Sequence, residues 1–206
     1  MTAAENPMLE KINTALPLER DPWRTPFGGA GFPEAAVLTA ITNESDPRVL
    51  LGRRALHLSN HPGEVAFAGG KREPEDSAPW DTALREAEEE VGIAPHQVRP
   101  LGELPPLMTR TGFQVHACVG SIEANPELVV DAAEFDSVFM APLATFADSS
   151  IFRLEKMFDG QRHRMVPHYQ VEDDNVWGVT AAILAMLANV AYDAGLDLQR
   201  DWKEKP

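Results

Sequence analysis

The chain has 206 residues, 44% of them hydrophobic, which is enough apolar material for one substantial core. Its 32 acidic residues against 18 basic ones give a formal net charge of −14, so the surface should repel nucleic acid and anionic membranes. The composition therefore argues against a general polyanion-binding protein. A phosphate compound could be attracted only locally, by bound divalent cations and a few grouped basic side chains.

The single cysteine, Cys118, excludes an internal disulfide and fits a reducing compartment. The first residues, 1–6, lack a basic region followed by an apolar stretch, and no segment approaches the ~20 apolar residues that span a bilayer. We therefore expect a cytoplasmic protein that has no membrane partner.

The first quarter of the chain predicts a helix, a loop and a hairpin. Residues 7–16 carry apolar side chains at helical spacing, whereas residues 17–33 are rich in Pro, Gly and Arg and predict a loop that wraps the domain. Residues 36–41 and 48–51 are short apolar strands on either side of a polar turn, which suits a hairpin.

The middle of the chain is mostly β, with strands expected over residues 65–68, 101–104, 113–122, 137–140, 152–157 and 162–166. The first of these strands runs into Gly69 and Gly70, which predict a sharp turn. Residues 79–91 have a strong helical pattern that begins at a proline and ends at Gly92. A second helix, rich in Ala, Leu and Met, is predicted over residues 176–192.

These elements predict one α/β domain with a short extension at each end. Residues 1–33 form the N-terminal helix and wrapping loop, residues 34–195 form the main domain, and residues 196–206 form a polar tail. The N-terminal arm is a candidate surface for a homodimer.

Three carboxylates gather on one face of the helix predicted over residues 79–91. Glu86, Glu89 and Glu90 lie at i, i+3 and i+4, where like charges destabilise an isolated helix by a few tenths of a kcal/mol per pair. A purely structural helix gains nothing from this spacing, and a Glu-rich helix is most often a solvated face. A hard divalent cation such as Mg²⁺ would compensate for the repulsion, because it prefers oxygen ligands.

The sequence around this helix resembles the Nudix box, G-x5-E-x7-R-E-U-x-E-E-x-G-U, in which U is apolar. Gly70 begins the match, and the run from Arg85 to Ile93 supplies its helical core. Two departures occur, since Asp76 stands where the box has Glu and eight rather than seven residues separate it from Arg85. Both lie in the loop, where one extra residue costs little closure entropy.

The resemblance implies the Nudix α/β/α sandwich, with a central mixed sheet between the two long helices. It also implies a loop-helix-loop site in which Glu86, Glu89 and Glu90 bind Mg²⁺, or Mn²⁺ as a substitute. The carbonyl of Gly69 is a further expected ligand. Arg85 is expected to orient a glutamate of this cluster rather than to touch the substrate.

The reaction that the resemblance implies is metal-assisted attack of water on a diphosphate. A general base must accept the proton of that water, and Glu89 and Glu134 are the candidates. Glu134 precedes a predicted strand and a Pro-Leu pair, which resembles a segment of the family that carries a glutamate. A solvated loop carboxylate is the alternative for Glu134.

A second resemblance, over residues 50–71, is to the coenzyme A diphosphatase branch of the family. The positions that fit its signature are Arg54, His61, Gly63, Glu64, Val65, Phe67, Gly69 and Gly70. Those that depart from it are Ala55, Ser59 and Ala68, of which Ser59 replaces an arginine. Serine cannot supply the bidentate charged contact that arginine makes with phosphate. The candidate substrate contacts are Arg53, Arg54, Lys71, Arg110 and Phe113.

Three functions remain open from the sequence. The first is cleavage of coenzyme A or acyl-CoA to phosphopantetheine and adenosine 3′,5′-bisphosphate. The second is a broader nucleotide diphosphatase that acts on NADH, ADP-ribose or nucleoside triphosphates, which the serine at position 59 favours. The third is a module that binds a nucleotide without hydrolysing it, against which the complete carboxylate set argues. In each case the partner is a small nucleotide rather than nucleic acid.

Overall fold

The computed structural model describes residues 6–18, 23, 31–158 and 163–198. Most of the loop predicted over residues 17–33, the hairpin turn that the sequence Asp159-Gly160 predicts between the strands at 152–157 and 162–166, and most of the predicted C-terminal tail lie outside these residues. The described elements are, in chain order, α1 Pro7–Ala15, β1 Glu34–Thr42, β2 Arg48–Arg54, β3 Val65–Ala66, β4 Gly69–Lys71, α2 Pro79–Val91, η1 Pro95–Gln97, β5 Arg99–Met108, β6 Gln114–Ile122, β7 Phe135–Pro142, η2 Leu143–Ala147, β8 Phe152–Phe158, β9 His163–Val171, β10 Asp174–Trp177 and α3 Gly178–Tyr192.

A seven-stranded mixed sheet forms the centre of the fold. Its main path is β3-β2-β1-β6-β5, with β4 paired to β1 and β7 paired to β2. The pair β1–β6 is parallel, whereas the other pairs in this sheet are antiparallel. A separate antiparallel sheet has the order β10-β9-β8.

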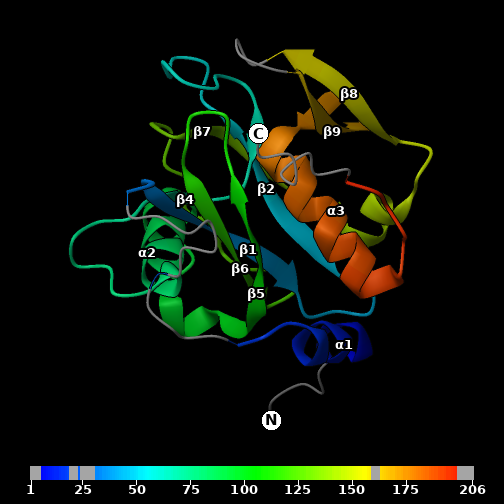
Figure 1. Cartoon of the computed structure of the whole chain (residues 1–206). Helices are drawn as coiled ribbons and strands as arrows, with labels where there is room; N and C mark the ends of the chain where they lie inside the picture. The colour runs from blue at the N-terminus through cyan, green and yellow to red at the C-terminus, as the bar shows by residue number, and fades with distance from the viewer. Residues whose placement is uncertain (1–5, 19–22, 24–30, 159–162, 199–206) are drawn as a thin grey trace.

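The helices cover both faces of the central sheet, as Figure 1 shows for α2 and α3. One apolar cluster joins α2 to inward side chains of β1, β2 and β6, and a larger one joins α1 and α3 to the opposite face. Strand β6 is buried along its whole length because it has a helix layer on each side. The predicted α/β/α sandwich with a central mixed sheet is confirmed.

Helix α1 packs into the same cluster as α3. Leu9 and Ile12 are fully buried there, and Lys11 Nζ lies 2.6 Å from a carboxylate oxygen of Asp193 just after α3. The apolar stripe of this helix therefore faces the chain's own core. A homodimer through the N-terminal arm stays a prediction.

Two local predictions were wrong. Residues 176 and 177 belong to β10 rather than to the closing helix, because Trp177 pairs with His168 of β9 and Gly178, with φ +67°, changes the backbone direction before α3. Gly69 and Gly70 lie in strand β4 rather than in a sharp turn, since they pair with Val37 and Ala36 of β1. In both places pairing with a distant strand overrides the local pattern.

Among the described residues, no helix has the length and hydropathy that crossing a bilayer requires.

Candidate active site

Helix α2 carries the three carboxylates of the predicted metal site. The Asp81 side chain accepts hydrogen bonds from the backbone N–H groups of Ser77 and Ala78, which caps the first turn. Gly92 ends the helix in the left-handed region, at φ +76°. On the face between these ends, Glu90 is buried, Glu86 is half-buried and Glu89 is exposed.

Strand β4 lies directly against this face of α2. The backbone N–H of Gly69 donates to Glu90 Oε2 at 2.9 Å, so the strand supplies a neutral donor to the buried carboxylate. A Cβ built at Gly70 would overlap the carboxylate of Glu86. The two glycines therefore allow a close approach between the strand and the glutamates.

Burial and mutual repulsion oppose the ionised form of the two inner glutamates. Burial, together with the charges of Glu86 and Glu134, raises the pKa of Glu90 to about 8, although the Gly69 hydrogen bond and Arg54 act to lower it. Burial also raises the pKa of Glu86 above its usual value, although Arg85 opposes the shift. Binding of a cation would be favourable here, because these buried carboxylates have too little positive charge nearby.

The donor set fits a hard divalent cation, because the ligands that Glu86, Glu89 and Glu90 offer are carboxylate oxygens. Within the described residues, no group of three or more His, Cys, Asp or Glu side chains is already arranged around one point as a metal cage. Instead, Glu86 and Glu89 both accept hydrogen bonds from Arg85, at 2.9 and 3.4 Å. Arg85 thereby holds two of the three carboxylates at the site.

Arg85 is itself held by the end of β4 and by the loop between β4 and α2. Its Nη2 donates to Asp76 Oδ2 at 3.0 Å and to the carbonyl of Lys71 at 3.2 Å. Asp76 is 5% exposed and also accepts from Thr82 Oγ1 at 2.6 Å and from the backbone N–H of Glu73 at 2.9 Å. Burial acts to raise the pKa of Asp76, but the hydrogen bonds from Arg85 and Thr82 outweigh it and lower that pKa. Asp76 is thus an ionised anchor for Arg85.

The role of Asp76 as the partner of Arg85 was not predicted from the sequence, in which Asp76 stood out only as a departure from the Nudix box. The sequence did contain a signal for this role, namely the shorter Asp together with one extra loop residue. A shorter side chain reaches Arg85 only if the loop brings it closer. Thr82 at i+6 is the second polar partner, and nothing in the helical pattern singled it out. The anchor is therefore a product of the folded loop.

Glu134, one of the two candidate bases, lies just before β7. Its side chain is 37% exposed and lies 3.4 Å from Nη2 of Arg54. Its backbone carbonyl accepts from the N–H of Ala55 at 2.9 Å, which joins it to the end of β2. Both Glu134 and Arg54 influence the pKa of Glu90, so the three side chains form one electrostatic group.

The five candidate substrate contacts do not all lie in one place. Arg54 joins the carboxylate group through Glu134. Arg53 binds both carboxylate oxygens of Asp174, at 3.0 and 2.6 Å, and its guanidinium lies 4.4 Å from the ring centre of Phe139. A substrate phosphate would have to compete with Asp174 for Arg53.

Lys71, the last residue of β4, lies beside Phe113. The ammonium of Lys71 is 5.4 Å from the centre of the Phe113 ring, which is within the range of a cation–π contact. Arg110 is exposed in the turn between β5 and β6, just before Phe113. These three residues could contact a ligand that extends from the carboxylates along β4.

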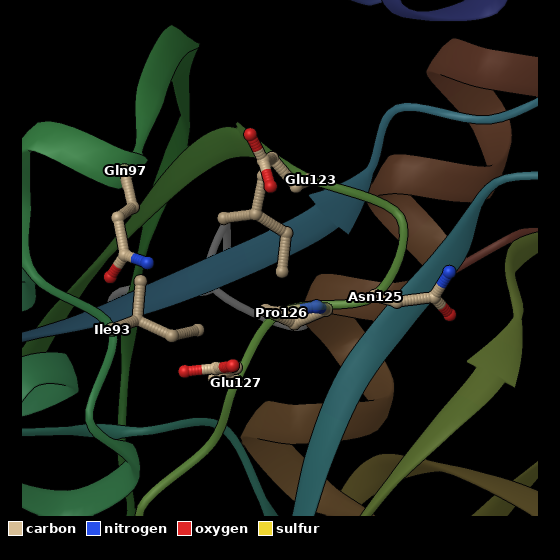
Figure 2. Close-up of a pocket in the computed structure, with 7 residues that line it drawn as sticks. Ile93, Gln97, Glu123, Asn125, Pro126 and Glu127 are labelled. Carbon is tan, nitrogen blue, oxygen red and sulfur yellow. The ribbon is translucent and has the colours of Figure 1, made fainter.

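A separate hollow of about 300 Å³ lies beyond the C-terminal end of α2, as Figure 2 shows. Its lining residues are Ile93, Gln97, Ile122, Glu123, Asn125, Pro126 and Glu127. None of the α2 carboxylates and no Lys or Arg belongs to this lining, which carries two acidic side chains instead. Such a surface would repel a diphosphate, so the hollow is not the active site.

Comparison with known proteins agrees with the geometry. Residues 32–164 match the family model of the NUDIX domain. A Nudix hydrolase named NudL from Yersinia enterocolitica is 42% identical over 155 residues, which cover 75% of this chain and 79% of that protein. NudL of Pectobacterium atrosepticum is 42% identical over 156 residues, which cover 75% of this chain and 81% of that protein.

Solved structures share the fold at low identity. A NUDIX hydrolase from Alicyclobacillus acidocaldarius superposes with a TM-score of 0.51 at 20% identity, over 79% of this chain and 94% of that chain. A MutT/nudix family protein from Enterococcus faecalis has a TM-score of 0.51 at 18% identity, over 83% of this chain and 66% of that chain. With the family model and the two NudL relatives, the conclusion is that this chain is an enzyme of the Nudix hydrolase family, whose members act on nucleoside diphosphate-linked substrates.

Proposed function

We propose that this enzyme is a Mg²⁺-dependent diphosphatase of coenzyme A or acyl-CoA, which releases phosphopantetheine and adenosine 3′,5′-bisphosphate. The observation that carries the metal-dependent chemistry is the group of Glu86, Glu89 and Glu90, packed against the glycines of β4 and held by Arg85. The coenzyme A assignment rests on the signature-like run over residues 50–71.

The three glutamates would hold the cation, together with the predicted carbonyl of Gly69. Bound there, Mg²⁺ or Mn²⁺ supplies neutralisation of the diphosphate and activation of the attacking water. The chain itself contributes orientation, since Arg85 binds Glu86 and Glu89 while the Gly69 N–H binds Glu90. A second observation supports this role for a cation, because burial raises the pKa of both Glu86 and Glu90.

The proton of the attacking water would pass to a carboxylate of this group. Glu134 is the first candidate base, because its carboxylate is 37% exposed to solvent and lies 3.4 Å from Arg54, beside Glu90. Glu89 is the alternative base and is also a proposed metal ligand, so the two roles would compete at one side chain. Arg54 would then bind either Glu134 or a phosphate oxygen, which couples substrate entry to release of the base.

The nucleotide would extend from the carboxylates towards Lys71, Phe113 and Arg110. Lys71 and Arg110 supply positive charge on a strongly acidic protein, and the Phe113 ring supplies an apolar surface for a base. A broader nucleotide diphosphatase is the second candidate function. Ser59 and the Arg53–Asp174 ion pair favour it, since both leave fewer free cations for the 3′-phosphate of coenzyme A.

The test is a comparison of kcat/KM with Mg²⁺ for coenzyme A, acetyl-CoA, NADH, ADP-ribose and dCTP. We expect coenzyme A or acetyl-CoA to rank first, with adenosine 3′,5′-bisphosphate as the nucleotide product. Coenzyme A in last place would reject the proposed substrate and leave the broader diphosphatase. No turnover of any substrate, despite binding, would favour the non-catalytic module.

A matched pair of variants tests the metal site. Glu90→Gln removes the charge of the buried carboxylate, whereas Glu88→Gln changes an exposed glutamate two residues earlier on the same helix. We expect Glu90→Gln to lower kcat at least tenfold, about 1.4 kcal/mol of barrier, and Glu88→Gln to leave it unchanged. Equal activity of the two variants would contradict the assignment of Glu90.

A further inference from the structure

Trp23 lies before the residues that match the NUDIX family model, yet it contacts the loop that organises the metal site. Its indole N–H donates to the carbonyl of Asp76 at 3.1 Å. Its ring meets His116 of β6 edge-to-face, with centroids 5.2 Å apart and an interplanar angle of 85°. The guanidinium of Arg72 lies over the same ring at 5.0 Å. Trp23 therefore contacts β6 through His116, the residue after β4 through Arg72, and the loop before α2 through Asp76.

Asp76 connects Trp23 to the glutamates. Its carbonyl accepts from Trp23 and from Nε of Arg72 at 3.2 Å, while its carboxylate binds Arg85 and Thr82. Arg72 is fixed in turn by Glu34 of β1, at 2.9 Å. The backbone of Asp76 is thus held from the N-terminal segment, and its side chain holds Arg85.

The contacts around Trp23 hold its ring in one orientation. Burial lowers the pKa of His116 to about 4, so the imidazole beside the indole is neutral near pH 7. The indole of Trp23 also packs against the apolar cluster beneath α2. One face of the ring contacts the Arg72 guanidinium, and the indole N–H donates to the Asp76 carbonyl. Together these contacts favour one orientation of the ring.

We propose that Trp23 is a positioning residue of the metal site: it fixes the backbone of Asp76, and through Asp76 and Arg85 it fixes the carboxylates of Glu86 and Glu89. This inference rests on the proposed metal-dependent function. It assigns to the N-terminal segment a part in catalysis, beyond the covering role that its sequence predicts. Trp23 does not touch the substrate in this account.

The test measures binding of Mn²⁺ alone, by calorimetric titration and by the loss of the free-ion electron paramagnetic resonance signal. Trp23→Phe keeps an aromatic ring beside His116 and Arg72 but removes the N–H, whereas Trp23→Leu removes both. Trp177→Phe is the matched control, because Trp177 is also half-buried and ring-stacked, on His168 in the second sheet. We expect the Mn²⁺ dissociation constant to rise about three- to tenfold in Trp23→Phe, the effect of one lost hydrogen bond, and further in Trp23→Leu.

A double-mutant cycle shows whether the effect passes through Asp76. In an Asp76→Asn background, where the charged anchor of Arg85 is absent, adding Trp23→Phe should weaken Mn²⁺ binding less than twofold. KM for the nucleotide should stay within twofold of the wild type in Trp23→Phe, because the ring does not contact the substrate. Thermal unfolding of each variant separates loss of the site from loss of the fold.

Unchanged Mn²⁺ binding in Trp23→Phe and Trp23→Leu, with normal binding by the wild type, would overturn the inference and leave the metal site intact. Equal weakening in Trp177→Phe would also overturn it, because the effect would then be general. A wild-type protein that binds no Mn²⁺ would instead reject the proposed function, and the role of Trp23 with it. Additive effects of Trp23→Phe and Asp76→Asn would reject the path through Asp76.

Discussion

Gly70→Ala tests whether the close approach of β4 to α2 creates the metal site. The added Cβ would overlap the carboxylate of Glu86, which is the end of a flexible side chain and can move away. The free energy of unfolding should therefore change by less than ~1 kcal/mol. The displaced Glu86 would lose its hydrogen bond from Arg85, which is 2.9 Å long in the structure. Because one of the three proposed ligands would then be misplaced, the metal affinity and kcat should fall at least tenfold, about 1.4 kcal/mol of barrier.

Gly69→Ala is the neighbouring control with the opposite expectation. A Cβ at Gly69 would overlap the carbonyl oxygen of Ala36 and lie 2.6 Å from Cα of Val37, and backbone atoms cannot move away cheaply. Gly69→Ala should therefore lower the free energy of unfolding by ~2 kcal/mol or more. Urea unfolding and Mg²⁺-dependent turnover, measured on both variants, separate the two effects. The reasoning would be refuted by a Gly70→Ala variant with wild-type turnover, or by one that loses as much stability as Gly69→Ala.

The remaining predictions concern the charges around the cluster. Because Glu90 titrates near pH 8 in the folded protein and near its usual value when unfolded, the metal-free native state holds the proton more tightly. In EDTA, the contribution of Glu90 to the free energy of unfolding should thus be greatest below about pH 4.5. It should fall by a few kcal/mol as the pH rises to 8. Glu90→Gln should flatten this slope in thermal melts, and excess Mg²⁺ should reverse the loss in the wild type; a slope that persists in Glu90→Gln would assign it to other groups. Glu134→Gln should lower kcat at least tenfold, or ~1.4 kcal/mol, with an unchanged Mg²⁺ requirement, and a smaller fall in steady-state rate would remove Glu134 as the base. Asp76→Asn should destabilise the fold by ~2 kcal/mol in chemical denaturation, because it removes the buried carboxylate that binds Arg85 and Thr82, and a stability equal to the wild type would show that Asp76 is no anchor.

Helix α2 is the element that the sequence predicted best. Its observed bounds, Pro79–Val91, are those expected from the apolar spacing, the proline at its start and Gly92 at its end. These signals are local, since each acts within one or two helical turns. The carboxylate set on this helix is local for the same reason, because residues at i, i+3 and i+4 share a face in any α-helix.

Strand boundaries depend on partners that a single stretch of sequence does not contain. The pattern over residues 176–192 is helical by composition, yet Val176 and Trp177 pair with Tyr169 and His168. Strand β5 was expected to be shorter, but it continues through two prolines because it lies at the edge of the sheet and its register shifts between Leu104 and Leu107. Such choices follow from which strands meet in the folded chain.

The sequence by itself determined the family, the fold class and the identity of the clustered glutamates, because these rest on residue types at short, regular spacing. Only the tertiary structure decided which groups hold those glutamates. The Gly69 N–H, the Asp76 carboxylate and the indole of Trp23 come from a strand, a loop and the N-terminal segment. Their contacts join residues up to 53 positions apart, and the buried environment that raises the pKa of Glu90 exists only when these segments pack together.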